Sequence, residues 1–189
     1  MAYIAFWRPN DEDPYPQFGQ WWLSDFALTP EVEAKFPEDI SQLSLIKEKP
    51  HVLEKLNCCV FNTAEKFMMM GKAALFNDNV VLRKMAQNDN PKLQKKLGRE
   101  VRNFDNDTWN RYCQDIVKIG NYLKFSQDEK LCQILLNTND AILVEGSPLD
   151  KIWGVGLKYD HPDISNPKRW RGTNYLGNCL MFVRNVLRK

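Results

Sequence analysis

The chain has 189 residues, a formal net charge of +2, 43% hydrophobic residues and 26% charged residues. This length suits one domain with a sizeable core, and the composition is that of an ordinary globular protein. No run of about eighteen apolar residues occurs, and residues 1–8 lack the pattern of a signal peptide. We therefore expect no membrane partner. The sequence also contains no low-complexity tract.

Cysteine and histidine usage bears on compartment and metal binding. Five cysteines form no CxxC pair, and an odd number without framework spacing fits reduced thiols in a reducing, cytoplasmic compartment. With only two histidines, His51 and His161, a zinc site is not expected. We predict neither a metal nor a cofactor.

The N-terminal third is punctuated by proline and aromatic residues. Residues 1–30 are predicted to be irregular or to form short strands around bulky anchors. Residues 27–56 resemble an inserted polar segment, in which Pro37 and Pro50 limit one or two short helices.

Helices dominate the remainder. Asn62 followed by Glu65 has the capping-box pattern and predicts a helix to about Phe76. A second helix is predicted from the Asn90 cap to Gly98 and a third from 107 to 124. Another capping box at 126–129 predicts a helix through 136. Residues 141–144 are predicted to form a buried strand, and a final helix is predicted to begin near 173. The expected fold is α+β: one mostly helical domain over 1–189 with a small sheet.

The helix after Asn62 is apolar nearly all round, which predicts that it is buried. Glu65 and Lys72 are its anomalies, and a spacing of seven residues places both on one stripe, roughly 10 Å apart. The structural explanations are the capping box for Glu65 and a stem that brings the Lys72 amine to water. The functional explanation is two reactive groups facing a pocket, with pKa values shifted by burial.

Two later segments could contact a ligand. The predicted strand leads into Glu145 and Asp150, followed by Trp153, which offers a stacking face for a base, and by Gly154 and Gly156. A tight turn around a core tryptophan explains the same residues. Arg171 and Gly172 then precede the last helix, whose N-terminus is a candidate phosphate site or an ordinary helix start.

Basic residues cluster locally despite the small net charge. One cluster precedes Glu100 and continues to Arg102, and a second lies before the last helix. Both are explained by solvated helix faces or by contact with phosphate groups. The members are Lys92, Lys95, Lys96, Arg99 and Arg102, and then Lys168, Arg169 and Arg171.

Together these segments resemble the NADAR family, also called YbiA-like. The matching elements are Phe61-Asn62-Thr63-Ala64-Glu65 with Lys72-Ala73, Lys96-Leu97-Gly98-Arg99, Trp109, Glu145-Gly146-Ser147-Pro148-x-Asp150-x-x-Trp153-Gly154-x-Gly156, and Gly172-x-Asn174-x-Leu176-Gly177. They run in the family's order over residues 57–187. The segment at 18–22 matches less well, and residues 27–56 depart from the family pattern.

The resemblance implies an N-glycosidase that acts on a ribosyl compound bearing phosphate. Members of the family are linked to removing ADP-ribose from modified guanine and to hydrolysing ribosylamino intermediates of riboflavin synthesis. The implied partner is an ADP-ribose or ribosyl-phosphate substrate, with an ADP-ribosylated nucleic acid as a further candidate. The implied substrate-binding residues are Asn62, Arg99, Trp109, Ser147, Trp153, Gly154, Gly156, Arg171, Gly172, Asn174 and Gly177.

Two mechanisms fit the candidate catalytic residues Lys72, Glu65, Glu145 and Asp150. In one, a carboxylate stabilises oxocarbenium character at ribose C1 while an acid protonates the leaving nitrogen. In the other, which we favour, the ribose ring opens and neutral Lys72 forms a Schiff base with C1. Lys72 as a phosphate ligand, a non-catalytic ADP-ribose-binding module and a purely structural protein are the alternatives.

Overall fold

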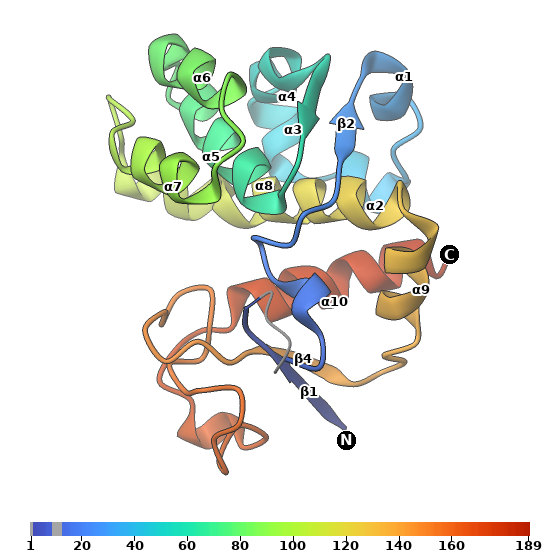
Figure 1. Cartoon of the computed structure of the whole chain (residues 1–189). Coiled ribbons are helices and arrows are strands. Elements are labelled where there is room, and N and C mark those ends of the chain that lie inside the picture. The colour runs from blue at the N-terminus through green and yellow to red at the C-terminus, as the bar shows by residue number, and fades with distance from the viewer. Residues whose placement is uncertain (1, 9–12) are drawn as a thin grey trace. The chain divides into compact units, whose positions relative to one another are not determined.

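The computed structural model describes residues 2–8 and 13–189, which separate into two compact units (Figure 1). The central unit comprises residues 23–127, and the terminal unit combines residues 1–22 with 128–189. Helices prevail and the sheets are small, so the predicted α+β class is confirmed. The single-domain organisation stays a prediction.

The central unit is built around one helix, α5 (Ala64–Leu75), which packs against α4 (His51–Leu56), α6 (Asn79–Ala86), α7 (Pro91–Arg99) and α8 (Asn106–Ser126). Every residue of α5 except Lys72 is buried, which confirms the burial expected from its apolar sequence. Glycines let its neighbours approach closely. A Cβ on Gly120 of α8 would lie 2.6 Å from the Phe67 ring of α5.

The predicted inserted segment is more helical than expected. Instead of one or two helices it contains α1 (Pro30–Glu33), α2 (Glu38–Ser41), α3 (Ser44–Glu48) and α4. It begins in β2 (Phe26–Leu28), which pairs antiparallel with β3 (Cys59–Phe61). Whether it is an insertion relative to the family stays a prediction.

Helix caps agree with the sequence-based expectation only in part. Asn90 caps α7 as predicted, and its Oδ1 accepts hydrogen bonds from the backbone N–H groups of Lys92 and Leu93. The cap of α5 is Thr63 rather than Asn62, and α9 (Glu129–Leu136) is capped by Asp128 rather than by the predicted Ser126 box.

The terminal unit contains a two-stranded parallel sheet of β1 (Tyr3–Phe6) and β4 (Ile142–Glu145), in the register Tyr3↔Ile142 to Phe6↔Glu145. Helix α10 (Tyr175–Leu187) contacts β4 and α9 (Figure 1). The single-turn helices η1 (Pro16–Phe18) and η2 (Pro167–Arg169) complete the unit. The backbone of 146–174 is otherwise irregular, and it carries many of the predicted site residues.

Candidate functional site

Lys72 is held by three groups in the central unit. Its Nζ donates a hydrogen bond to the Gly98 carbonyl oxygen at 2.8 Å and lies 4.2 Å from the Phe104 ring centroid and 5.4 Å from that of Trp109. The side chain is half-buried. The hydrogen bond and the two ring contacts therefore hold the Lys72 amine at the edge of the core of the central unit.

Opposing effects act on the protonation of this amine. Burial lowers the pKa of Lys72 from its ordinary value. The carbonyl at the C-terminal end of α7 and the two ring faces favour the charged form. No acidic residue of the adjoining elements forms an ion pair with Lys72 within the described chain. The acidic residues nearest in sequence to its contacts are Glu65, Glu100, Asp105 and Asp107.

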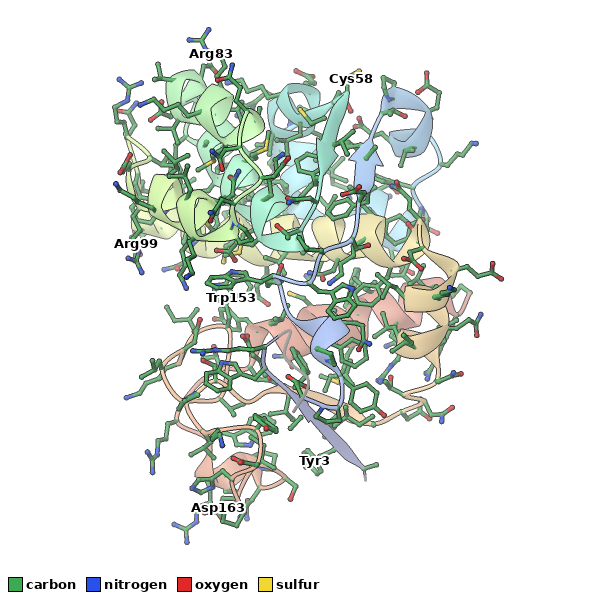
Figure 2. The ribbon with its side chains drawn as sticks, in the orientation of Figure 1. Tyr3, Cys58, Arg83, Arg99, Trp153 and Asp163 are labelled. Carbon is green, nitrogen blue, oxygen red and sulfur yellow. The ribbon has the colours of Figure 1, made fainter. Side chains whose placement is uncertain are left out.

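Gly98 explains part of the Lys-Leu-Gly-Arg motif. A Cβ at this position would lie 2.1 Å from Met69 Sδ of α5. A larger residue would force the Met69 side chain, α7 or both to move, and a movement of α7 would displace the carbonyl that accepts from Lys72. Arg99, the next residue, is exposed on the last turn of α7 (Figure 2).

Glu65 is 7% exposed and lies in the first turn of α5. Because Thr63 is the cap, the capping-box explanation of Glu65 is wrong. A carboxylate in the first turn is favoured by the helix dipole. No hydrogen bond or ion pair joins it to Lys72 in the described structure, so a proton moving between them needs water or substrate as a relay.

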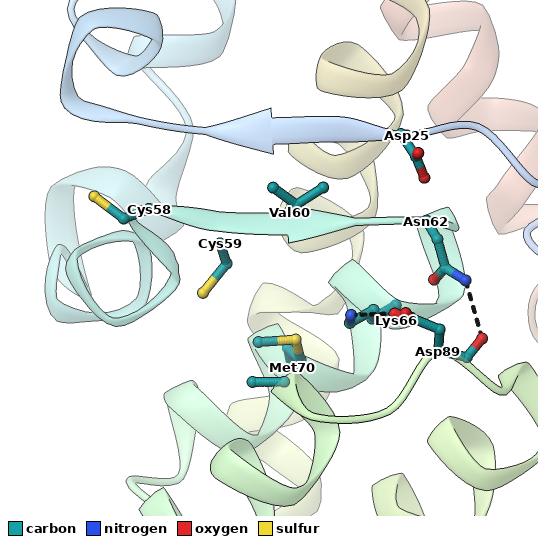
Figure 3. Close-up of a pocket in the computed structure, with 9 residues that line it drawn as sticks. Asp25, Cys58, Cys59, Val60, Asn62, Lys66, Met70 and Asp89 are labelled. Atoms are coloured by element: carbon teal, nitrogen blue, oxygen red, sulfur yellow. Dashed lines mark hydrogen bonds and ion pairs between the residues drawn. The ribbon is translucent and has the colours of Figure 1, made fainter.

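Asn62 lies at a separate pocket of about 460 Å³ in the central unit (Figure 3). Its Nδ2 donates to the Asp89 carbonyl at 2.9 Å, and the Lys66 ammonium pairs with the Asp89 carboxylate at 2.6 Å. Neither Lys72 nor Trp109 lines this pocket. A substrate-binding role for Asn62 stays a prediction.

In the terminal unit, Asp150 forms a turn. Its Oδ1 accepts from the backbone N–H groups of Ile152 and Trp153 at 2.9 and 2.8 Å. This explains the Asp-x-x-Trp spacing by local backbone hydrogen bonding. Trp153 is half-buried and contacts Tyr175 edge to face, with centroids 6.0 Å apart.

Asn174 connects β4 to the start of α10. Its Nδ2 donates to the Leu143 carbonyl at 2.9 Å and its Oδ1 accepts from the Glu145 N–H at 3.0 Å. It has a left-handed backbone with φ of 55° and is 1% exposed. This arrangement accounts for Asn174 as a structural link and fixes the backbone of Glu145 at the end of β4.

The motif glycines permit backbone contacts within the terminal unit. A Cβ would lie 2.1 Å from the Leu143 oxygen at Gly177, 2.4 Å from the Gly154 oxygen at Gly172 and 2.9 Å from the Glu145 oxygen at Gly154. Gly156 has a φ of +69°, which favours glycine. Packing alone therefore requires these glycines, whatever they contact in a ligand.

The structure thus forms two groups of predicted site residues. The central group contains Lys72 and Trp109 with Glu65 on the same helix as Lys72, and Arg99 follows the carbonyl that binds Lys72. The terminal group includes Glu145 and Asp150, and its other members are Ser147, Trp153, Gly154, Gly156, Arg171, Gly172, Asn174 and Gly177. Ser147 is buried and Arg171 exposed.

Sequence reasoning missed Phe104, which approaches Lys72 more closely than Trp109 does. The residue is 43% exposed, and its ring contacts that of Phe76 at a centroid distance of 5.2 Å. The available signal was an aromatic residue in a short and mostly polar connection, directly before the Asp105 cap of α8.

The described residues contain no cluster of three or more metal-ligating side chains, and all five cysteines, which lie within the described part, are free thiols. No described helix is both long and apolar enough to cross a membrane.

Comparisons with known proteins place these residues in a family context. The chain is 43% identical over 122 residues to N-glycosidase R617 of Acanthamoeba polyphaga mimivirus, covering 65% of this chain and 72% of that protein. It is 34% identical to Protein irg-1 of Caenorhabditis elegans, covering 74% and 65%. A third relative is N-glycosidase Npun_R5314 of Nostoc punctiforme, at 32% identity over 42% of this chain and 44% of that protein.

The fold has a solved counterpart. The NMR structure of Escherichia coli YbiA matches with a TM-score of 0.68 over 99% of this chain and 85% of that chain, at 20% identity. The family model of the NADAR domain matches residues 5–188. The chain therefore belongs to the NADAR domain family.

Proposed function

We propose that this protein removes ADP-ribose from ADP-ribosylated guanine by cleaving the N-glycosidic bond at ribose C1. The broader activity does not depend on this choice of substrate. The chain is an N-glycosidase, a hydrolase acting on N-glycosyl bonds, as the names of its relatives from mimivirus and Nostoc support.

The observation that carries the proposed mechanism is the position of Lys72. It is the one residue of α5 that is not buried, and its amine is held by a carbonyl and two rings without a carboxylate partner within the described chain. Such an amine needs to lose only its proton to become a nucleophile, and burial favours that loss. An amine locked in an ion pair would be a poorer candidate.

The chemistry follows from the glycosylamine nature of the substrate. The ribose ring oxygen leaves C1 as the nitrogen lone pair forms an imine, and the ring oxygen takes a proton. Neutral Lys72 adds to C1, the guanine amine leaves after gaining a proton, and an imine between Lys72 and C1 remains. Water hydrolyses this imine, which releases ADP-ribose and restores the lysine amine.

The carboxylate mechanism has less support from the residues. One oxygen of Asp150 already accepts two backbone hydrogen bonds, which favours a turn-forming role. Glu65 remains the carboxylate of the central unit on the same helix as Lys72, so it is the proposed proton relay or, if the lysine route fails, the stabilising carboxylate.

For the phosphates we propose Arg99, with Arg171 and the backbone near Gly172. Both arginines are exposed. Arg99→Ala should raise KM more than it lowers kcat, since it removes binding common to the ground and transition states. An unchanged KM would remove Arg99 from the site.

The deciding assay compares ADP-ribosylated guanosine with phosphorylated ribosylamino pyrimidines, using purified protein and following release of the amine-bearing product, which is guanosine from the first substrate and the aminopyrimidine from the second. The proposal predicts turnover of the guanosine compound and its loss in Lys72→Arg, which keeps the charge but is not a neutral nucleophile. Lys84→Arg, an exposed change on α6, is the matched control. Turnover of the pyrimidine alone would replace the substrate assignment with the riboflavin intermediate.

A further inference from the structure

Helix α7 carries a continuous basic stripe, which we define as Lys92, Lys95, Lys96 and Arg99. Spacings of three, four and seven residues place these side chains on one face of a helix. All four are exposed, while Gln94, Leu97 and Gly98 on the other face are buried. The stripe therefore lies on the side of α7 turned away from the core of its unit.

The surrounding charge reinforces the stripe. Residues 79–102 contain seven lysines and arginines but only two acidic residues, Asp89 and Glu100. This local charge of +5 exceeds the net charge of +2 for the whole chain, so the remainder is net negative. Two of these charges are paired with residues outside the range, Asp89 with Lys66 and Arg102 with Asp78. Arg83 on α6 points outward like Arg99 (Figure 2).

We infer that the basic stripe binds the phosphodiester backbone of a nucleic acid. From Lys92 to Arg99 the stripe covers about 10 Å along the helix axis. Each nucleic-acid strand carries a phosphate for roughly every 3.4 Å of axial rise, so the stripe matches about three consecutive phosphates. Basic side chains that neutralise successive phosphates displace counterions, which makes such binding independent of sequence and sensitive to salt.

The composition of the basic stripe disfavours two other classes of partner, a membrane surface and another protein. An amphipathic helix that binds a membrane surface buries its apolar face in lipid, whereas Leu97 of α7 is buried in the protein. Protein interfaces have an apolar or aromatic core, and the stripe contains no such residue. Charge without apolar anchors is what a phosphate backbone requires.

This surface goes beyond cleavage of the N-glycosidic bond, because it concerns binding along a strand. One consequence rests on the proposed function: a modified guanine within an oligonucleotide should be cleaved with a higher kcat/KM than the free modified nucleoside. Binding itself can be tested with unmodified nucleic acid, so the two claims can fail separately.

The test measures fluorescence anisotropy of a labelled, unmodified 20-nucleotide single strand with the full chain at several salt concentrations. Lys92→Gln with Lys95→Gln should reduce the slope of log K against log salt by about 1.4, at about 0.7 for each phosphate that is no longer neutralised. Lys35→Gln with Lys47→Gln, exposed residues outside α7, gives the same change of charge and should leave the slope unchanged.

An equal reduction of the slope in both double variants would overturn the inference, since net charge rather than the stripe would control binding. Competition by polyglutamate as strong as that by the oligonucleotide at equal charge would also overturn it, because the stripe would then be a general polyanion surface. In the α7 double variant, cleavage of the free modified nucleoside should persist while the advantage of the oligonucleotide disappears.

Discussion

Replacing Phe104 by leucine should lower the pKa of Lys72. The Phe104 ring centroid lies 4.2 Å from Nζ, within the range of a cation–π interaction, and the residue is 43% exposed. A partly exposed interaction of this kind stabilises the cation by about 0.5–1 kcal/mol. One pKa unit corresponds to about 1.36 kcal/mol, so the pKa should fall by about 0.4–0.7 units.

The sign follows from which form loses a partner. Phe104 stabilises the ammonium, whereas leucine retains apolar bulk without a ring face, so the protonated form loses stability relative to the neutral amine. Below its pKa, the neutral fraction of Lys72 should rise about 2.5–5-fold. If neutral Lys72 is the nucleophile, kcat/KM measured at pH values below the pKa of Lys72, where the neutral fraction limits the rate, should rise by a similar factor.

The assay is the pH dependence of Lys72 modification by an amine-specific reagent, mapped by peptide mass spectrometry. It requires no substrate and is therefore independent of the proposed activity. Phe36→Leu is a matched control, because Phe36 contacts Tyr122 rather than the lysine. An unchanged or higher pKa of Lys72 in Phe104→Leu would refute the reasoning.

Three further changes test the structure around the site. Asp78→Asn should destabilise the protein by about 2–4 kcal/mol in chemical denaturation, since this buried carboxylate caps α6 and binds Arg102. Because Arg102 keeps the native pKa of Asp78 below its ordinary value, this loss of stability should shrink as pH falls below about 4. Gly98→Ala should cost about 1–3 kcal/mol in the same measurement, and adding Met69→Ala should recover part of it; full additivity would contradict the close contact. Burial lowers the pKa of Lys124 to about 7, so between about pH 7 and 10 the unfolded chain binds more protons than the folded protein. The stability of the wild type relative to Lys124→Met should therefore rise over this range, and a difference that does not change with pH would exclude the lowered pKa.

Helices were predicted correctly where an uninterrupted apolar run or an adjacent pair of helix-start residues marked them in the sequence. The uninterrupted apolar character of residues 64–75 correctly indicated a buried helix, and Asn90 followed by Pro91 correctly located the start of α7. Asn62 and Ser126 were wrong as caps because each precedes another residue able to cap, Thr63 in one case and Asp128, two positions later, in the other. The extended backbone of Thr63, with φ of −152° and ψ of 153°, decides which side chain reaches the helix N–H groups.

The candidate site was less accessible to sequence reasoning. Lys72 stood out because it is a charge on an apolar helix, but its partners come from α7 and the connection to α8, which the pattern of one helix cannot specify. The eight-residue helix α6 was missed altogether. Asn174 and Asp150 matched family motifs, yet their backbone hydrogen bonds became apparent only with the three-dimensional arrangement.

Trapping with borohydride tests the central claim most directly. Protein, ADP-ribosylated guanosine and borohydride are incubated together, and the digested protein is analysed for a ribosyl adduct, because borohydride reduces an imine to a stable amine. Lys72 should carry the adduct, with none on the buried, ion-paired Lys66 of the same helix and none in Lys72→Arg. Cleavage by wild-type protein without any adduct, together with substantial activity in Lys72→Arg, would contradict the account.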